Sequence, residues 1–448
     1  MQRQGKAIVA GLATVSVCFG ASSAYSQENM VIESSPQVAT ETVEDTEQGV
    51  FTSYDLPDTD DRYTGFQRDL GPGDPIGIRA GAFMVYPSLQ TSVTYDDNIY
   101  ADENNTTDDV IVTVRPEVQI VSQWARHQVS LLAGMSRLWY LDTHSQDQTN
   151  YDIALGGRLD VTSATVVDAE VGWAQLHENR GDSGAVADAA EETEYDRTFA
   201  SVGVTQAINR LEFSVGGDYT KLDYKDVPAF GGGTINNDFR DRDMYSVGAR
   251  AGYEWTPLTQ FFVSGSYNFR RYDLQPPEVA VDKDSQGFRI GAGVQFTVTN
   301  LITGEASVGY MRQTYDNDGF DPIDAPAYNI EFVWTPTALT TVTVAGGSQV
   351  SESTQDTSAG YVSYDIDVGV VHALTRRVSV NASAGYEYDD YDDIGRNDDY
   401  YRLGLGADYA INPWVSVGAG YEFQHRSSNF TGIEYSRNRV GIDLSAQY

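Results

Sequence analysis

The stretch Val378-Ser-Val-Asn-Ala-Ser-Ala-Gly-Tyr-Glu-Tyr388 alternates apolar residues with polar or small ones over eleven positions. An alternation with a period of two places the two sets of side chains on opposite faces of a β-strand. The same pattern recurs in Phe288–Val298 and Val415–Phe423. One face of each predicted strand suits lipid and the other suits water.

The connections between such stretches alternate in length. Short ones fall at 124–126, 163–164, 209–210, 256–258, 300–301, 335–337, 375–376 and 412–413. Longer ones, acidic or rich in Gly and Asn, fall at 101–109, 178–196, 226–241, 274–285, 317–326 and 389–399, and near His144, Thr354 and Asn429. Short turns at one end and long loops at the other are typical of an outer-membrane barrel. The series predicts a transmembrane antiparallel up-and-down β-barrel of about 18 strands.

Four tryptophans, Trp124, Trp255, Trp334 and Trp414, adjoin short turns. They would form an aromatic girdle at one membrane edge. A soluble β-sandwich or propeller is the structural alternative, but sandwich strands are about half as long as these. A single closed sheet also removes the exposed edges that lipid would not tolerate.

The N-terminus has the layout of a secretory signal peptide. Arg3 and Lys6 precede the apolar stretch Ala7–Phe19, and cleavage could follow Ala24 or Ser26. We therefore expect residues 1–26 to be a signal peptide, 27–80 an acidic disordered periplasmic arm and 81–448 the barrel. The expected location is the outer membrane of a Gram-negative cell, reached by secretion across the inner membrane.

The composition excludes several classes of protein. The chain has 65 Asp and Glu against 29 Lys and Arg, a net charge of -36, which argues against nucleic acid as a partner. Its single cysteine, Cys18, lies in the expected signal peptide, so neither a disulfide nor cysteine-ligated zinc is expected in the barrel. The mean hydropathy of -0.38, with no long apolar run after that peptide, excludes a helical membrane protein.

The last strand, Arg439-Val-Gly-Ile-Asp-Leu-Ser-Ala-Gln-Tyr448, ends in an aromatic residue. Apolar side chains share the face of that residue at alternate positions. This pattern resembles the signal read by the outer-membrane barrel assembly machinery. The residues concerned are Val440, Ile442, Leu444, Ala446 and Tyr448.

The first strand carries a second resemblance. Phe83-Met-Val-Tyr-Pro-Ser-Leu89 is followed by Val93-Thr-Tyr-Asp-Asp-Asn-Ile-Tyr100. This stretch resembles the opening of the outer-membrane β-barrel porin family found beside exopolysaccharide synthesis and export genes. The matching residues are Tyr86, Pro87, Tyr95, Asp96, Asp97, Asn98 and Tyr100. The resemblance implies a conduit for secreted polysaccharide.

No constellation for catalysis or for a cofactor is evident. The five histidines, His127, His144, His177, His372 and His425, lie near predicted strand ends, turns or loops without a metal-binding spacing. Asp316-Asn-Asp318-Gly319 has oxygen ligands of the calcium-binding kind but lacks the Glu of a full EF-hand loop. Solvated acidic loops are the simpler interpretation, and divalent-ion bridging to lipopolysaccharide phosphates is the alternative. We expect no enzyme, no metal and no cofactor.

The predicted water-facing side of the strands carries charges of both signs, with acid in excess. A charged lumen of this kind predicts a preference for cations. In the alternative, these charges pair with each other inside a filled, structural barrel. The pore-lining candidates are Arg158, Asp160, Asp168, Glu170, Arg250, Glu254, Arg270, Arg289, Glu387, Arg402, Asp408, Glu422 and Asp443.

These features predict a passive conduit for exopolysaccharide export. The alternatives are a general cation-preferring diffusion porin and a structural or adhesive barrel with a filled lumen. If one loop folds inward, 178–196 and 226–241 are the candidates by length. The expected partners are outer-membrane lipid and lipopolysaccharide, the barrel assembly machinery and polysaccharide export proteins.

Overall fold

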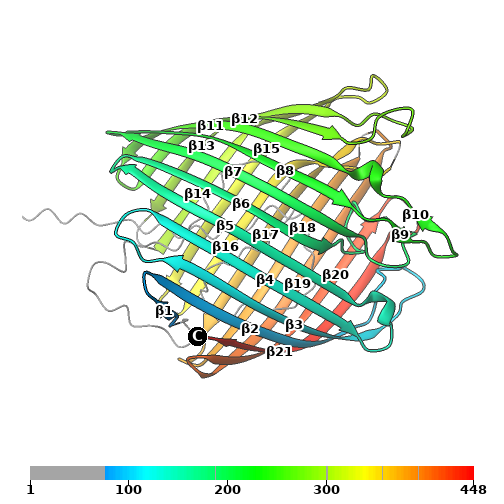
Figure 1. Ribbon diagram of the computed structural model, residues 1–448, viewed down its shortest axis with the longest axis horizontal. Helices are drawn as coiled ribbons and strands as arrows, with labels where there is room; N and C mark the ends of the chain where they lie inside the picture. The colour runs from blue at the N-terminus through cyan, green and yellow to red at the C-terminus, as the bar shows by residue number, and fades with distance from the viewer. Residues whose placement is uncertain (1–75, 187, 299–300, 356, 392) are drawn as a thin grey trace, which may run out of the picture.

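The computed structural model describes residues 76–186, 188–298, 301–355, 357–391 and 393–448. Eighteen long strands form one closed antiparallel barrel, tilted across its wall (Figure 1). The first long strand pairs with the last, from Ser88 opposite Gln447 to Asp96 opposite Arg439. The expected signal peptide and nearly all of the expected arm lie outside the described residues. No helix among the described residues is long and apolar enough to cross a membrane.

The wall is built from strands of similar length, rich in Val, Ile, Thr and Tyr, which suit a pleated surface. In chain order they are β2 (Phe83–Asp96), β3 (Asp109–Ser122), β4 (Gln128–Tyr140), β5 (Gln148–Thr162), β6 (Thr165–His177), β7 (Glu194–Ile208), β8 (Leu211–Tyr224), β11 (Arg242–Thr256), β12 (Thr259–Tyr272), β13 (Ser285–Val298), β14 (Ile302–Tyr315), β15 (Ile323–Thr337), β16 (Thr340–Glu352), β17 (Gly360–Ala373), β18 (Val378–Tyr391), β19 (Arg396–Asn412), β20 (Val415–Ser428) and β21 (Tyr435–Gln447).

Small elements decorate the two ends of the barrel. The short strand β1 (Ile78–Ala80), within the last residues assigned to the arm, pairs with the start of β2. A hairpin of β9 (Val227–Pro228) and β10 (Thr234–Ile235) projects from the loop between β8 and β11. Two 3-10 turns, η1 (His144–Gln146) and η2 (Asp238–Arg240), lie in long loops.

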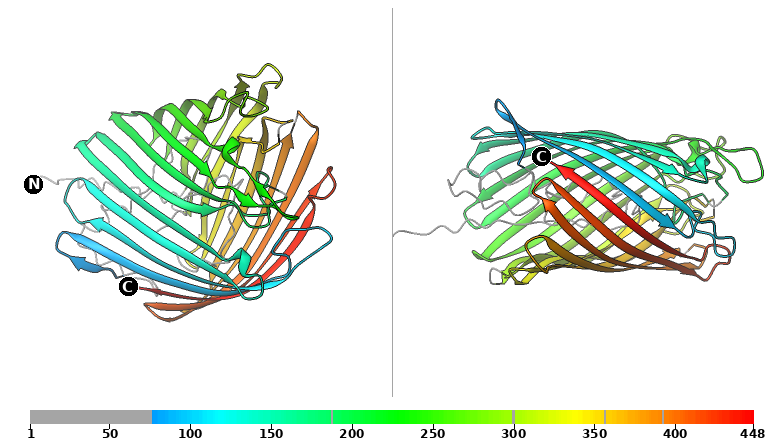
Figure 2. Two further views of the ribbon diagram at one scale, coloured as in Figure 1. Left: turned by 45° about the vertical axis from the view of Figure 1, so that its right-hand side comes forward. Right: turned by 90° about the horizontal axis from the view of Figure 1, so that it is seen from below.

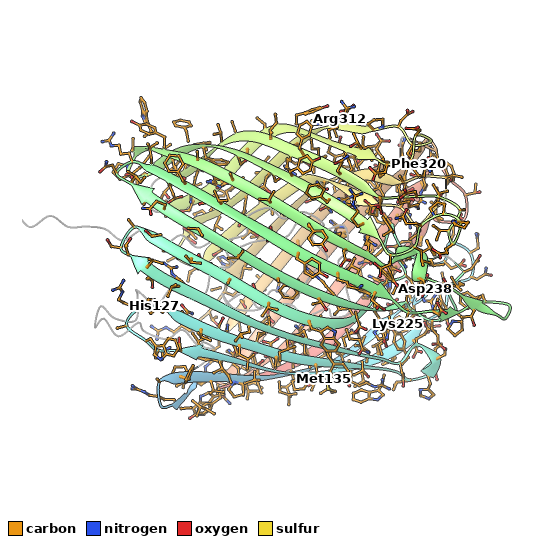
Figure 3. All side chains as sticks on the ribbon, turned by 45° about the horizontal axis from the view of Figure 1, so that its top comes forward. His127, Met135, Lys225, Asp238, Arg312 and Phe320 are labelled. Carbon is orange, nitrogen blue, oxygen red and sulfur yellow. The ribbon has the colours of Figure 1, made fainter. Side chains whose placement is uncertain are left out.

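The two ends of the barrel differ as the sequence predicts. The eight short connections between wall strands lie at one end, and the nine other connections lie at the opposite end (Figure 2). The turn predicted at 335–337 is displaced: β15 continues to Thr337 through an irregular register that accommodates Pro336, and the connection is 338–339. Figure 3 shows His127 at the short-turn end and Lys225 and Asp238 at the loop end. The short-turn end faces the periplasm in barrels of this class, so the long loops face outward from the cell.

Two predicted loops are shorter than the sequence indicates. Of residues 389–399, most belong to β18 and β19, and only 392–395 connect them. Their acidic composition resembles that of a loop, but these residues continue the two strands at the loop end of the barrel. Of 317–326, residues from Ile323 onward belong to β15, so Pro326 lies inside a strand. Proline in a sheet is confined to strand edges and irregularities, which is why this stretch resembles a loop.

The outer face of the wall is apolar, as expected for a surface in lipid. Val440, Ile442 and Leu444 of β21 are 52%, 61% and 44% exposed, whereas Asp443 between them is buried. The four tryptophans beside short turns are likewise exposed, as the predicted girdle requires. Three small apolar clusters, centred on Leu138, Leu222 and Met311, lie buried near the loop end. The interior is therefore packed most densely toward the loops.

Candidate functional site: the barrel lumen

The motif of the first strand joins the two ends of the barrel sheet. Asp96, fully buried, accepts hydrogen bonds from Arg437 at 2.7 Å and Arg439 at 3.0 Å, both on β21. Asn98, also fully buried, donates from its amide to the carbonyl oxygens of Asp102 and Ser436. The buried carboxylate is thus compensated by two guanidinium groups of the neighbouring strand.

Further bonds extend this closure along the seam between β2 and β21. Asp97 accepts from the backbone and the side chain of Asn438. The backbone N–H of Tyr448 donates to the carbonyl of Pro87 at 3.2 Å. Tyr95 faces outward and donates to Asp108. The remaining motif residue of the strand, Tyr86, lies on β2 near the short-turn end.

The loop between β6 and β7, described at residues 178–186 and 188–193 and called here the luminal segment, crosses the interior of the barrel. Ser183 hydrogen-bonds both Asp389 of β18 and Tyr400 of β19, and the amide oxygen of Asn179 accepts from Arg437 of β21. In strand order β18 and β19 lie about halfway round the barrel from β6 and β7. The segment therefore spans the lumen rather than covering its own edge.

Neighbouring loops hold the near side of the luminal segment. The guanidinium of Arg180 lies 4.7 Å from the ring centre of Tyr100 and 5.6 Å from that of Phe230, which caps the β9–β10 hairpin. Arg180 also donates to Gln146 of η1 at 2.7 Å. Such a cation over aromatic rings contributes on the order of 1 kcal/mol. Tyr100, the last residue of the family motif, thus connects the barrel closure to the luminal segment.

Ion pairs complete this attachment. Glu178 accepts two hydrogen bonds from Arg240 of η2, and both side chains are nearly buried. Glu192 accepts from Gln148 at the start of β5. The loop 226–241, the second inward candidate from the sequence, therefore supports the luminal segment from behind.

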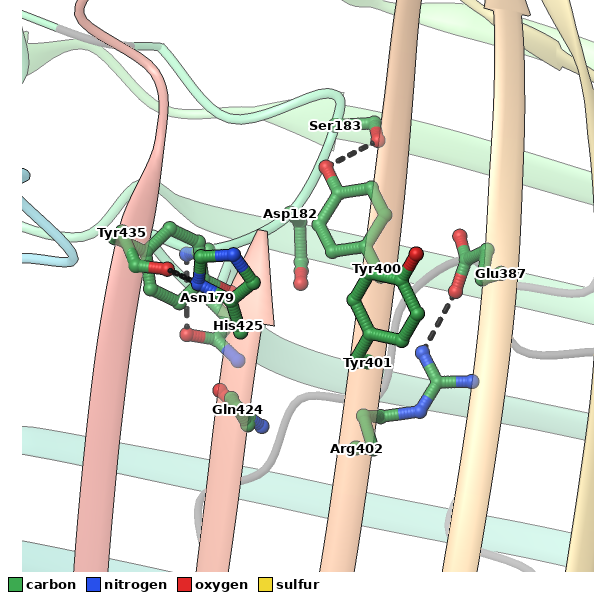
Figure 4. Close-up of a pocket in the computed structure, with 11 residues that line it drawn as sticks. Asn179, Asp182, Ser183, Glu387, Tyr400, Tyr401, Arg402, Gln424, His425 and Tyr435 are labelled. Atoms are coloured by element: carbon green, nitrogen blue, oxygen red, sulfur yellow. Dashed lines mark hydrogen bonds and ion pairs between the residues drawn. The ribbon is translucent and has the colours of Figure 1, made fainter. Parts of the chain in front are cut away.

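A recess lies between the luminal segment and the far wall (Figure 4). Asp182 points into it, with Tyr400 and Tyr435 on the wall and the Glu387–Arg402 pair beside them. Burial raises the pKa of Asp182 well above its usual range, and the neighbouring acids Glu178, Glu192 and Glu387 raise it further. The raised pKa favours the protonated form of Asp182, which suits its dense and acidic environment.

Several pore-lining candidates are paired in the loop-end half of the barrel. Arg402 donates to Glu387 at 2.7 Å, and Arg270 pairs with Glu352 of β16. Arg289 donates to the backbone carbonyls of Ser348 and Tyr328 at 2.7 and 2.8 Å. These charges are satisfied by protein partners.

Nearer the middle of the strands, Arg250 makes a two-pronged pair with Glu305 at 3.0 and 2.8 Å, and its guanidinium lies 3.6 Å from the ring centre of Phe262. The carboxylates of Asp408 and Asp443 converge over Gly418, where the space of a missing side chain accommodates them. Acidic charge is concentrated on this part of the wall.

The remaining candidates lie apart. Arg158 donates to Asp160 at 3.2 Å near the short turns, opposite Asp168 on β6. Glu170 shares the face of Asp168 and Glu254 shares that of Arg250. Glu422 accepts from Gln424 at 2.8 Å. The assignment of all these residues to a conducting path stays a prediction.

The sequence did not single out Asn179, Ser183 or Glu352, which anchor the interior. Only loop length identified the luminal segment, because a serine and an asparagine in a loop carry no distinctive pattern. In the possible calcium-binding loop, the carboxylate of Asp316 already forms an ion pair with Arg271 at 2.9 Å. Among the described residues, no three side chains of His, Cys, Asp or Glu converge as metal ligands.

An apolar outer face, a polar interior and a closed antiparallel wall define an outer-membrane β-barrel of the porin class. The family model described as "Putative beta-barrel porin 2" matches residues 71–448, and the chain belongs to this family. No curated protein matches it.

Solved outer-membrane proteins resemble the fold at low identity. The siderophore receptor PiuA from Acinetobacter baumannii is 10% identical, with 83% of this chain and 82% of that chain covered and a TM-score of 0.46. OccAB2 of the same organism is 12% identical, with 82% and 99% covered and a TM-score of 0.46. The outer membrane protein OpdK from Pseudomonas aeruginosa is 12% identical, with 81% and 99% covered and a TM-score of 0.43.

Proposed function

We propose that this barrel is a passive outer-membrane conduit, obstructed at its outer end by the luminal segment, and that it serves exopolysaccharide export. The conduit function is supported mainly by the way in which the luminal segment is attached to the barrel wall. It reaches the far wall through side chains such as Ser183 and Asn179 and not through a strand added to the wall. Such contacts can be released without breaking the barrel.

The charge of the interior supports a preference for cations and for polymers of low negative charge. Asp408 and Asp443 converge on one wall, and Asp168 is exposed near the short turns. A ring of like charge in a pore biases which ions enter. The polysaccharide cargo is supported by the resemblance of the motif from Tyr95 to Tyr100 to porins beside polysaccharide genes.

Planar bilayers test the conduit. Purified full-length protein is compared with a variant that lacks residues 180–190. We expect cation-selective conductance in both, with larger steps in the deletion variant because the obstruction is gone. The conduit would be refuted if both proteins stayed silent while inserted as folded, heat-modifiable barrels.

Gene deletion tests the cargo separately. We expect the deleted strain to lose secreted polymer while the cells remain intact, and complementation to restore it. Normal secretion would refute the polysaccharide assignment and leave a general cation-preferring diffusion porin, for which uptake of small solutes would fall instead.

The buried ion pairs favour one second candidate, a structural or adhesive barrel with a filled lumen. Arg270 and Glu352, 2% and 4% exposed, occupy space that a wide channel would leave to water. Charge reversal separates the two functions: Arg250→Glu and Arg289→Glu change conductance and ion selectivity in a channel. In a structural barrel they change neither.

A further inference from the structure

The wall is interrupted between β15 and β16. Their ladder runs from Thr337 and Thr340 only as far as Asn329 opposite Gly347. Continued in the same register, Tyr328 would face Ser348, and then Pro326 would face Val350 and Asp324 would face Glu352, but no such ladder pairing is present although both strands are described in full. Only the hydroxyl of Ser348 still bridges the strands, accepting from the N–H of Tyr328 and donating to the carbonyl of Pro326. Pro326 has no N–H to donate, so β15 presents an edge at this point.

Beyond the break, β16 lies inside the barrel. In the paired half, Val342 is opposite Trp334, an exposed residue of the outer face. The period of two assigns Ser348, Val350 and Glu352 to that same outer face. All three are instead buried.

The neighbours of Val350 show where this end of β16 is. Val350 belongs to one cluster with Met311 of β14 and with Ile323 and Ala325 of β15. Met311 faces inward, because Tyr310 beside it is on the exposed outer surface. The outer face of β16 therefore packs against the inner face of its neighbours. The end of β16 is folded into the lumen, while β17 keeps its ladder to β18 as far as Val362 opposite Asp390.

Three cations hold the folded-in end through backbone carbonyls. Arg270 donates to Val350 at 2.7 Å and Arg289 to Ser348 at 2.7 Å. Lys283 donates to the carbonyls of Ser353 and Gln355 at 2.7 and 2.8 Å. These bonds replace the ladder bonds that β16 gives up, which keeps buried carbonyl groups satisfied.

On the outside, Tyr328 covers the position that β16 has left. Its hydroxyl donates to the carbonyl of Asp365 on β17 at 2.9 Å, and its ring stacks on Tyr364 at 6.3 Å. On the outer surface, the gap between β15 and β17 is thus covered by the side chain of Tyr328, which contacts β17 directly. A seal of this kind can open without unfolding a strand.

We propose that the end of β16, from Ser348 to Glu352, forms a gate in the barrel wall. Folded inward, it narrows the lumen beside the luminal segment; moved outward, it rejoins β15 in the register that Asn329 and Gly347 begin. Gly346 and Gly347 lie at the bend, and a side chain on Gly346 would collide with the carbonyl of Asp365. The inference rests on the proposed conduit function and adds a second moving part to it.

A cysteine pair tests the movement. Asp324 is exposed on the outer surface and Glu352 is buried inside, so Asp324→Cys with Glu352→Cys can form a disulfide only when β16 rejoins β15. The matched control is Val333→Cys with Thr343→Cys, at positions already opposite each other. All variants carry Cys18→Ser, since Cys18 is the chain's only cysteine.

We expect both pairs to cross-link under oxidation in outer-membrane vesicles. In bilayers, oxidation should raise the conductance of the Asp324→Cys/Glu352→Cys protein by about two-fold, reversibly with dithiothreitol, because the lumen is cleared. The control pair should show no change. Glu352→Cys alone reports what loss of the Arg270 partner does without a cross-link.

Failure of the test pair to cross-link, while the control pair does, would overturn the gate. A cross-link that leaves conductance unchanged would overturn it too, provided that the variant lacking residues 180–190 conducts. If that deletion variant is also silent, the conduit itself fails, and the cross-link alone then decides whether the end of β16 moves.

Discussion

Asp96 joins the first and last strands of the barrel sheet, because its buried carboxylate pairs with two arginines of β21. From the sequence, Asp96 is identified only as part of a family motif, and its structural role does not follow from the motif. That role depends on the register of β2 against β21, which brings positions 341 and 343 residues apart into contact. No local pattern contains that information.

Asp96→Asn should therefore weaken the closure of the barrel. Removing one partner of a buried ion pair costs ~3–5 kcal/mol, since Arg437 and Arg439 stay buried with their charge uncompensated. We expect a lower urea midpoint and a lower temperature for loss of the compact band on gels. Asp108→Asn, at an exposed partner of Tyr95, should change stability by no more than about 0.5 kcal/mol. Equal effects of the two changes would contradict the role given to Asp96.

Aspartates at the start of several strands have a second role that composition does not reveal. Asp147, Asp241 and Asp284 each accept the backbone N–H of a tyrosine that ends the preceding strand, at 2.9, 2.7 and 2.7 Å. From sequence these residues are simply part of acidic loops. The structure shows that the acid excess at the loop end partly serves to terminate strands.

The pair of carboxylates over Gly418 gives a prediction on selectivity. Asp408→Asn and Asp443→Asn remove negative charge from one wall, so the preference for cations over anions should fall in each and fall further in the double variant. Reversal potentials in a salt gradient measure this. Asp399→Asn, on the outward face beside Tyr386, is the matched control and should leave the reversal potential unchanged. A reversal potential insensitive to all three changes would place the conducting path elsewhere.

At the scale of elements, the strands and turns follow from the sequence and the interior does not. Alternation and turn residues act locally, which is why most of the short turns were predicted at their observed places, although the turn predicted at 335–337 lies at 338–339. The route of the luminal segment depends on contacts such as Ser183 with Tyr400, 217 residues away. The inward fold of β16 likewise depends on arginines of β12 and β13.

The luminal segment should respond to pH through Asp182. The pKa of Asp182 is raised while the luminal segment is seated in the barrel. The carboxyl group of Asp182 therefore binds its proton more tightly in the seated segment than in a released one. The stabilisation is complete below the ordinary carboxyl pKa of 3.8 and declines as the pH rises toward the raised value. We therefore expect conductance to increase as the pH rises above 3.8.

Asp182→Asn provides the control for this pH effect. The amide keeps the shape of the side chain and cannot ionise, so the rise of conductance with pH should disappear. Glu178, Glu192 and Glu387 still face the position, and Arg402, Tyr400, Tyr435 and His425 line the same recess. If the variant kept the profile of the native protein, one of these groups and not Asp182 would control the response.

For the whole molecule, the alternation along β21 predicts opposite tolerance of charge on its two faces. Ile442→Arg places a guanidinium in lipid near the middle of the strand and should cost ~2–4 kcal/mol. Ser445→Arg, on the inner face, should be tolerated because water and acidic groups surround it. Urea unfolding in lipid vesicles measures both, and equal costs would contradict the assignment of the faces.

The network around Arg437 sets an order of events during biogenesis. This one guanidinium contacts both Asp96, on the first strand, and Asn179, in the luminal segment. Because Arg437 belongs to the strand made last, the crossing segment gains this far anchor only after the C-terminal strand is in place. The contact of Asn179 with Arg437 is thus available only once β21 has paired with β2, whereas the bonds of Ser183 to β18 and β19 do not depend on that closure.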